Sequence, residues 1–267
     1  MMFEYEFMRR AYLAGSVLAV ILPLIGLPIL LKRLSMMGDT LSHASLAGVA
    51  IGLCLGFDPL LGSPWSPASW QPWGVELISS RLKAYQEIST VIVLATAIGL
   101  AGIFTSLTGG SNAISSYLFG SIVTIGDFEL ALVLVVAAVV LVTYRLIYDR
   151  LYLSAFDPVA APLMGIDGRA LNLAFSFLVA ITVSVAAKTI GSLIVSSLMV
   201  IPVICAMQFA RSYRGTLLLS IALSLAFVHA GLAVSYHQNL RPGSVIVLIA
   251  VLALSVAMLA KRRWGYL

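Results

Sequence analysis

Charged side chains are scarce in this sequence. Only 10% of its 267 residues are Asp, Glu, Lys or Arg, whereas a soluble domain carries about a quarter. Hydrophobic residues make up 61% of the chain, and the mean hydropathy is +1.05. This composition excludes a sizeable soluble domain and predicts a protein that crosses a membrane several times.

Cysteine is almost absent too. Cys54 and Cys205 both lie in apolar runs, so we expect buried apolar fillers and not a disulfide framework. The net charge of +5 comes from basic residues placed in pairs at segment ends. That placement fits the positive-inside rule and argues against nucleic-acid binding. The chain also lacks a Gly-x-x-x-x-Gly-Lys-Ser/Thr loop and a His-Glu-x-x-His pair, so we expect no nucleotide site and no enzymatic activity of its own.

Several apolar runs are long enough to span a bilayer, which takes about 20 residues. The segment 58–80 is different, because its four prolines and three tryptophans argue against a regular helix. It is either an interfacial loop or a broken crossing covered by protein. We therefore expect an all-α transmembrane bundle of eight or nine spanning helices, forming one domain over residues 1–267. The eight clear runs are 11–31, 40–57, 89–107, 128–147, 171–187, 190–210, 216–236 and 243–260.

Basic residues at the ends of these runs predict the topology. They can share the cytoplasmic side only if segment 58–80 also crosses, which places the N-terminus outside. Arg9 and Arg10 near the N-terminus favour the opposite placement. The basic groups in question are Lys32 with Arg33, Arg81 with Lys83, Arg145 with Arg150 and Arg169, Arg211 with Arg214, and Lys261 with Arg262 and Arg263.

Asp39 and His43 are ionisable residues within an apolar run. Four residues apart on a helix, their side chains stack on one face. A carboxylate and a neutral imidazole suit a divalent metal such as zinc or manganese, and ionisable groups at membrane depth usually line a pathway. A buried structural pair is the alternative. We predict that Asp39 and His43 contact a metal ion that passes through the membrane.

Four motifs, in order, resemble the permease subunits of bacterial ABC importers for zinc, manganese or iron(II), which are relatives of the vitamin B12 and siderophore permeases. The first is Gly38-Asp39-Thr40-Leu41-Ser42-His43-Ala44, and the second is Tyr117-Leu118-Phe119-Gly120-Ser121. The third is Ser154-Ala155-Phe156-Asp157-Pro158 followed by Met164-Gly165-Ile166, and the fourth runs from Gly191 to Pro202. The resemblance covers nearly the whole chain. Segment 63–74 departs from it, because the family has an apolar helix there.

The resemblance implies a type II ABC-importer-like fold in the bacterial inner membrane. It implies that a homodimer, or a pair with a similar permease, receives a divalent metal ion from an extracytoplasmic binding protein. ATP would be hydrolysed on a separate cytoplasmic ABC ATPase subunit, with no permanently bound cofactor in this chain. The loop 148–170 would couple to that ATPase through Phe156, Asp157, Pro158 and Gly165.

The roles of two histidines stay open, and two alternative functions remain. His229 is either hydrogen-bonded to a neighbouring helix or a further pathway ligand, and His237 is either a solvated residue or a contact for the incoming ion. An ion-coupled secondary transporter is one rival function, weakly disfavoured because no inverted repeat is evident. An intramembrane metalloenzyme is the other, and it would need a third ligand.

Overall fold

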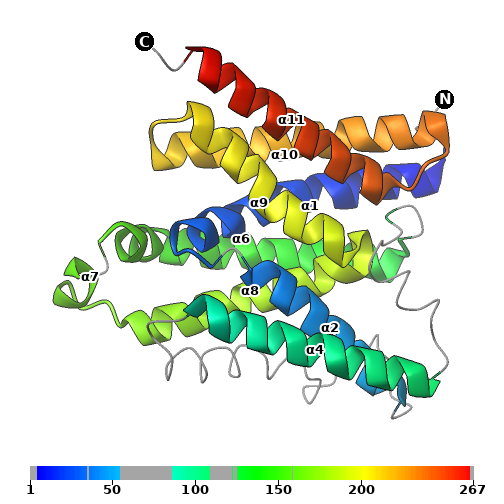
Figure 1. The fold of residues 1–267 in the computed structure, drawn as a ribbon, viewed down its shortest axis with the longest axis horizontal. Helices are drawn as coiled ribbons and strands as arrows, with labels where there is room; N and C mark the ends of the chain where they lie inside the picture. The colour runs from blue at the N-terminus through cyan, green and yellow to red at the C-terminus, as the bar shows by residue number, and fades with distance from the viewer. Residues whose placement is uncertain are drawn as a thin grey trace.

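The computed structural model describes residues 5–34, 36–54, 86–108, 122, 125–157 and 159–264. These residues form nine α-helices and no strand (Figure 1). Segment 58–80, the Tyr117–Ser121 motif and Pro158 lie outside the described residues, so the predicted ninth crossing stays a prediction. The helices are α1 (Glu6–Leu31), α2 (Met37–Cys54), α4 (Gln86–Thr108), α6 (Asp127–Phe156), α7 (Ala160–Leu163), α8 (Gly168–Ile190), α9 (Ser192–Phe209), α10 (Tyr213–Gln238) and α11 (Pro242–Trp264).

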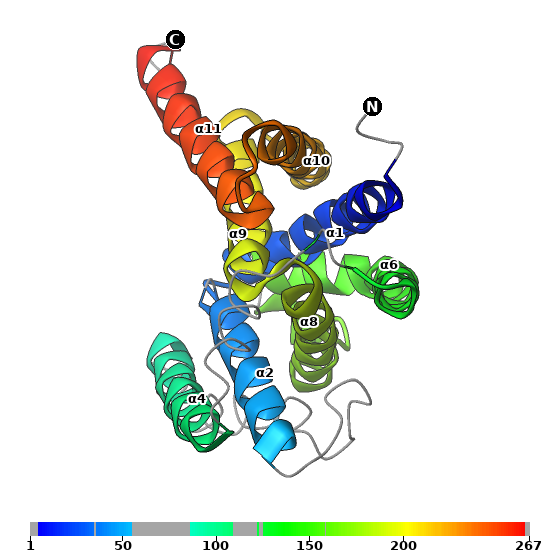
Figure 2. The ribbon, with the colours of Figure 1, turned by 90° about the vertical axis from the view of Figure 1, so that its right-hand side faces the viewer.

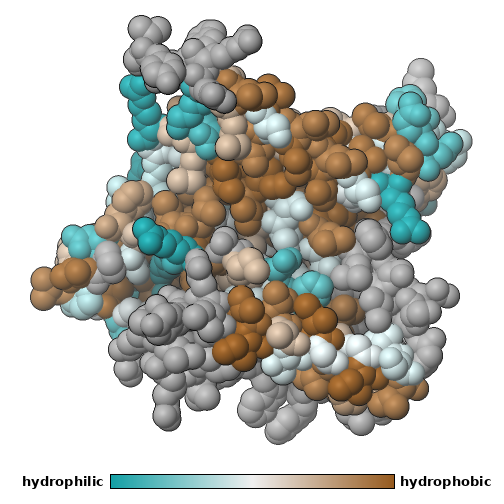
Figure 3. All heavy atoms as spheres, in the orientation of Figure 1, coloured by the Kyte–Doolittle hydropathy of each residue, from teal (hydrophilic) through white to brown (hydrophobic). Residues whose placement is uncertain are grey.

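The predicted all-α membrane bundle is confirmed. Seven of the described helices are long and apolar enough to cross a membrane, namely α1, α4, α6, α8, α9, α10 and α11. Large apolar side chains are exposed along α4, α6 and α11, as at Ile103, Val142 and Leu252. Brown apolar atoms cover much of the middle of the molecule in Figure 3. Such a surface suits a lipid environment.

Helix α1 is the centre of the bundle. It contacts α6, α8, α9 and α10, and Figure 2 shows it crossing between α6 and α10. Most of its residues are buried, including Pro23 and Pro28 within the helix. Gly26 allows the closest contact, because an added Cβ would lie 1.9 Å from the backbone oxygen of Met199 on α9. Small residues at such contacts let helix backbones approach in lipid.

One predicted boundary is wrong. The run expected to end at residue 147 continues as α6 to Phe156, and α7 and the start of α8 also lie within 148–170, so most of the predicted loop is helical. Arg145, Asp149 and Arg150 lower the hydropathy of this stretch but do not interrupt a helix, and α6 contains neither glycine nor proline. The connection to α8 begins only at Asp157, where α6 is capped.

The helix ends that carry four of the five predicted basic groups gather at one end of the bundle, and the fifth group, Arg81 with Lys83, lies outside the described residues. The C-terminal end of α1, the α6–α7 junction, the α9–α10 turn and the C-terminal end of α11 lie on the left in Figure 1. The N-terminus, the start of α6 and the α10–α11 turn lie on the right. We call the right-hand end the outer end, following the topology predicted from the basic residues.

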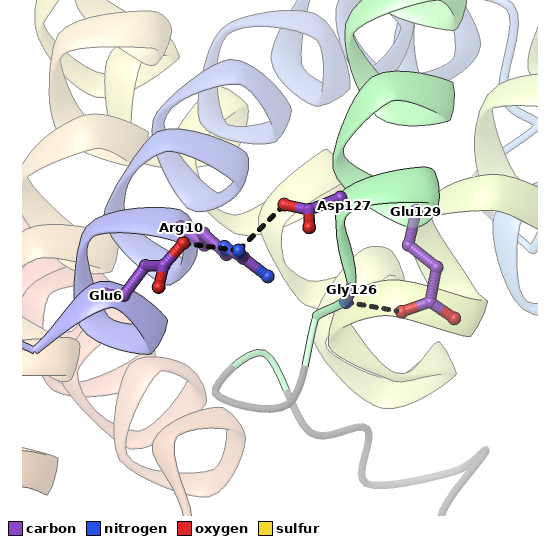
Figure 4. Close-up of polar contacts among 5 residues, drawn as sticks. All are labelled: Glu6, Arg10, Gly126, Asp127 and Glu129. Carbon is purple, nitrogen blue, oxygen red and sulfur yellow. Dashed lines mark hydrogen bonds and ion pairs between the residues drawn. The ribbon is translucent and has the colours of Figure 1, made fainter.

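Arg10 at the outer end is paired with carboxylates. Its Nη2 lies 2.8 Å from Asp127 Oδ1 on α6 and 2.5 Å from Glu6 Oε1 on its own helix (Figure 4). Glu129 accepts a hydrogen bond from the Gly126 N–H at 3.3 Å and lies 3.5 Å from Lys188 Nζ on α8. Arg10 thus joins the first turn of α1 to the first turn of α6 at this end of the bundle.

Candidate metal centre

Asp39 and His43 both lie on α2, one helical turn apart, and both are half-buried. Asp39 is in the first turn of the helix, where the backbone dipole favours a negative charge. Between them, Thr40 and Ser42 are fully buried. The predicted spacing on one helix is therefore present, and the carboxylate and imidazole remain partly accessible.

The Asp39 carboxylate is held by another helix. Ser196 Oγ on α9 donates a hydrogen bond of 2.7 Å to Asp39 Oδ1. His43 makes no hydrogen bond or ion pair with any other described residue. The two predicted metal-contacting groups thus differ, because only the Asp39 carboxylate is hydrogen-bonded to α9.

Met199 sets the distance between α2 and α9 at this point. A Cβ on Gly38 would lie 2.0 Å from Met199 Cε, and Gly26 on α1 meets the Met199 backbone from the other side. Met199 is fully buried. Two glycines thus let three helices meet beside Asp39.

His229 lies elsewhere, between α10 and α1. Its Nδ1 is 2.7 Å from the Leu225 backbone oxygen, and its Nε2 is 3.2 Å from Ser16 Oγ. Its ring also lies 5.4 Å from that of Tyr12. Both ring nitrogens therefore have protein partners, as expected for a histidine that joins two helices.

His237 is exposed in the last turn of α10, with its ring 5.7 Å from that of Tyr236. Among the described residues, no three His, Cys, Asp or Glu side chains come together as a group that could hold a metal ion. Neither His229 nor His237 is brought to Asp39 and His43 in such a group.

Three predicted coupling residues, Phe156, Asp157 and Gly165, flank the short helix α7 at the left-hand end of the bundle in Figure 1. Asp157 Oδ1 accepts hydrogen bonds from the Val159 and Ala160 N–H groups, at 3.2 and 2.9 Å, which caps the start of α7. Gly165 closes it with φ of +76°, a conformation that favours glycine. The Gly165 N–H bonds to Pro162 O and the Ile166 N–H to Ala161 O, as in a Schellman motif.

The surface of this segment is apolar and exposed. Phe156 is 57%, Val159 77%, Leu163 86% and Met164 70% exposed. Figure 1 shows α7 projecting from the left-hand end of the bundle, beyond the spans. Apolar side chains exposed beyond the membrane region favour contact with another protein.

Comparison with known proteins decides the family. The model of the ABC 3 transport family matches residues 4–261. The chain belongs to the ABC 3 transport family. It is accordingly a multi-pass membrane transport permease.

Relatives of this ABC 3 family permease cover nearly its full length. A Treponema pallidum protein named "Probable metal transport system membrane protein" is 34% identical, over 95% of this chain and 97% of its own. The "Manganese import system permease protein ScaB" of Streptococcus gordonii is 28% identical, over 99% of this chain and 95% of its own. The solved structure "PsaBC from Streptococcus pneumoniae in complex with Fab" has the same fold, with a TM-score of 0.84, 23% identity and coverage of 96% of this chain and 92% of that one.

Two structural features were missed by sequence reasoning. Ser196 lies in the Gly191–Pro202 motif, but two adjacent serines there gave no sign of which one reaches Asp39. Tyr213 of α10 packs among aromatic residues of α6. The four-residue spacing of Tyr144, Tyr148, Tyr152 and Phe156 is a signal that could have revealed an aromatic face on α6.

Proposed function

We propose that this permease carries a divalent metal ion into the cell and that Asp39 and His43 contact the ion. The observation that carries the proposal is the half-buried carboxylate–imidazole pair on α2, one turn apart in an apolar bundle. Two protein ligands leave the metal shell incomplete, so that water or backbone oxygens supply the rest. Incomplete coordination suits a transporter, because an ion that is bound too tightly is not released.

Manganese(II) is the first candidate substrate, and zinc and iron(II) are the alternatives. Carboxylate, water and imidazole ligands accept all three ions. Relatives named as manganese import or transport proteins in Streptococcus gordonii and Listeria monocytogenes support manganese. Both side chains bind metal in their deprotonated forms, so acid weakens binding.

The proposed energy source is a separate ABC ATPase that docks on α7. The exposed apolar residues around α7 and the two caps that hold it support this role. An extracytoplasmic binding protein delivers the ion to the outer end of the bundle, and two permease chains form the pathway. Closure of the ATPase subunits then moves α7 and opens the path inward.

The test is uptake of radioactive manganese(II) and zinc by proteoliposomes that contain the permease, its ATPase and its binding protein. Asp39→Asn is the sharpest variant, because an amide oxygen still accepts the hydrogen bond of Ser196 while the charge is lost. We expect Asp39→Asn and His43→Ala to abolish ATP-dependent uptake, with normal membrane insertion. His237→Ala serves as the control histidine, and we expect it to transport.

Normal uptake by Asp39→Asn and His43→Ala would show that this pair is structural. Uptake that follows an ion gradient without ATP would instead support a secondary transporter. Comparison of the two metals under the same conditions identifies the substrate.

A further inference from the structure

Two neighbouring serines of α9 have different partners. Ser196 Oγ lies 2.7 Å from Asp39 Oδ1, and its contact with the Ser192 backbone oxygen in its own helix is longer, at 3.3 Å. Ser197 Oγ donates to the Leu193 backbone oxygen at 2.8 Å and lines a groove towards α11 with Gly243. Of these two hydroxyls, only that of Ser196 donates a hydrogen bond to the proposed metal-contacting carboxylate of Asp39.

The contact between α2 and α9 continues outward from this hydrogen bond. The two helices run in opposite directions (Figures 1 and 2), with Met199 at Gly38 and Ser196 at Asp39. One turn further out, this register brings Ser192 of α9 to the level of Ser42 and His43 on α2.

The hydroxyls at that level are not satisfied by the protein. Ser42 is 0% and Ser192 2% exposed, and neither Oγ atom has a hydrogen-bond partner among the described residues. Buried polar groups without partners are rare and costly. Partner-free hydroxyls at the level of His43 are consistent with a polar ligand at this contact, such as a metal ion or its water molecules.

We propose that Ser196 is a positioning residue for the metal ion, acting through Asp39. This inference rests on the proposed role of Asp39. The Ser196 hydroxyl fixes the orientation of the carboxylate, so that less freedom is lost when the ion binds. Hydrogen-bond partners of metal ligands matter in this way, and their loss typically lowers metal affinity about 10- to 100-fold.

The experiment compares Ser196→Ala with the matched control Ser197→Ala in the complete transporter, with manganese(II) and zinc as the probes. We expect Ser196→Ala to raise the apparent KM for the transported metal about tenfold or more, with little change in the rate at saturating metal. Ser196→Thr keeps a hydroxyl and should restore a KM near that of the unmodified protein. Ser197→Ala should leave both parameters unchanged.

Two results would overturn this inference. One is an equal KM for Ser196→Ala and Ser197→Ala, and the other is a Ser196→Ala defect confined to the maximal rate. Asp39→Asn, measured in parallel, distinguishes a failure of the proposed role of Ser196 from a failure of the proposed metal site. Lost uptake in Asp39→Asn with an unchanged KM in Ser196→Ala refutes the role of Ser196 alone, whereas normal uptake in Asp39→Asn refutes the proposed site itself.

Discussion

Replacing Gly26 by alanine is a direct test of the packing that holds the proposed site. The added Cβ would lie 1.9 Å from Met199 O and 2.9 Å from its carbonyl carbon. Carbon and oxygen atoms that are not bonded approach to about 3.3 Å at best. The shortfall is therefore about 1.4 Å, and the obstructing atoms belong to the backbone of α9, which cannot rotate away as a flexible side chain can.

The cost follows from this overlap. Forcing extra methyl groups into a packed core typically costs about 1–3 kcal/mol, and more where backbone must move. Replacing glycine within a helix by alanine otherwise stabilises by about 0.5–1 kcal/mol. For a chain of this size each kcal/mol corresponds to about 2–4 °C in Tm, so we expect Gly26→Ala to lower the Tm by several degrees.

The assay is thermal unfolding of the purified protein in detergent, with Gly102→Ala as the control. A Cβ at Gly102 on α4 meets nothing within 4 Å, so this variant should keep or raise the Tm. Because Met199 lies three residues after Ser196 on α9, Gly26→Ala should also raise the KM for the metal. Equal Tm values for Gly26→Ala and Gly102→Ala would refute the close contact between α1 and α9.

Three further predictions concern the two ends of the bundle. Asp157→Ala removes the cap of α7, at a cost of about 1 kcal/mol, and should reduce ATP-driven uptake without changing metal affinity. Asp157→Asn is an equally good cap and should be active. Equal uptake by the two variants would argue against a role for the cap. Asp127 is 81% exposed, and Arg10 also pairs with Glu6. Asp127→Asn should therefore lower the free energy of unfolding by less than about 1 kcal/mol. A Tm lowered by many degrees would contradict this. Burial lowers the pKa of Lys32 at the end of α1, so between that lowered pKa and the ordinary lysine value near 10.5 the unfolded chain holds more protons. Stability should therefore rise with pH in this window and rise less in Lys32→Met; equal pH slopes of the two unfolding curves would refute this.

The sequence predicts those features that depend on local spacing. Long apolar runs identify the spanning helices, because a bilayer requires backbone hydrogen bonds to be satisfied within each span. The four-residue spacing of Asp39 and His43 places them on one helix. The hydrogen bonds at the two ends of α7 are likewise local, because they join residues within five positions of one another.

Contacts between distant segments could not be predicted in this way. Ser196 and Asp39 are 157 residues apart, and two adjacent serines differ only in the side of α9 on which they lie. The end of α6 was also missed, because hydropathy falls at Arg145 and Arg150 while helix-forming residues continue. Packing partners and polar helix extensions therefore need the three-dimensional structure.

Helix α6 connects the two ends of the molecule as one rigid element. It has 30 residues without glycine or proline, a length of about 45 Å. In its first turn, Asp127 forms an ion pair with Arg10 of α1, and Glu129 forms one with Lys188 of α8. Its last residue leads directly into the cap of α7. A helix of this kind has no sequence feature that favours a kink.

In the proposed mechanism, a displacement of α7 is passed along α6, because α6 has no kink-forming residue that would absorb it. Near α7 the ring of Tyr213 packs against those of Tyr148 and Tyr152, at 5.6 and 5.2 Å, so α10 is packed on this end of α6. Along its length α6 packs against α1, whose Gly26 is in direct backbone contact with α9. Because α9 carries the hydroxyl that holds Asp39, a partner that moves α7 has a continuous packed route to the proposed metal site.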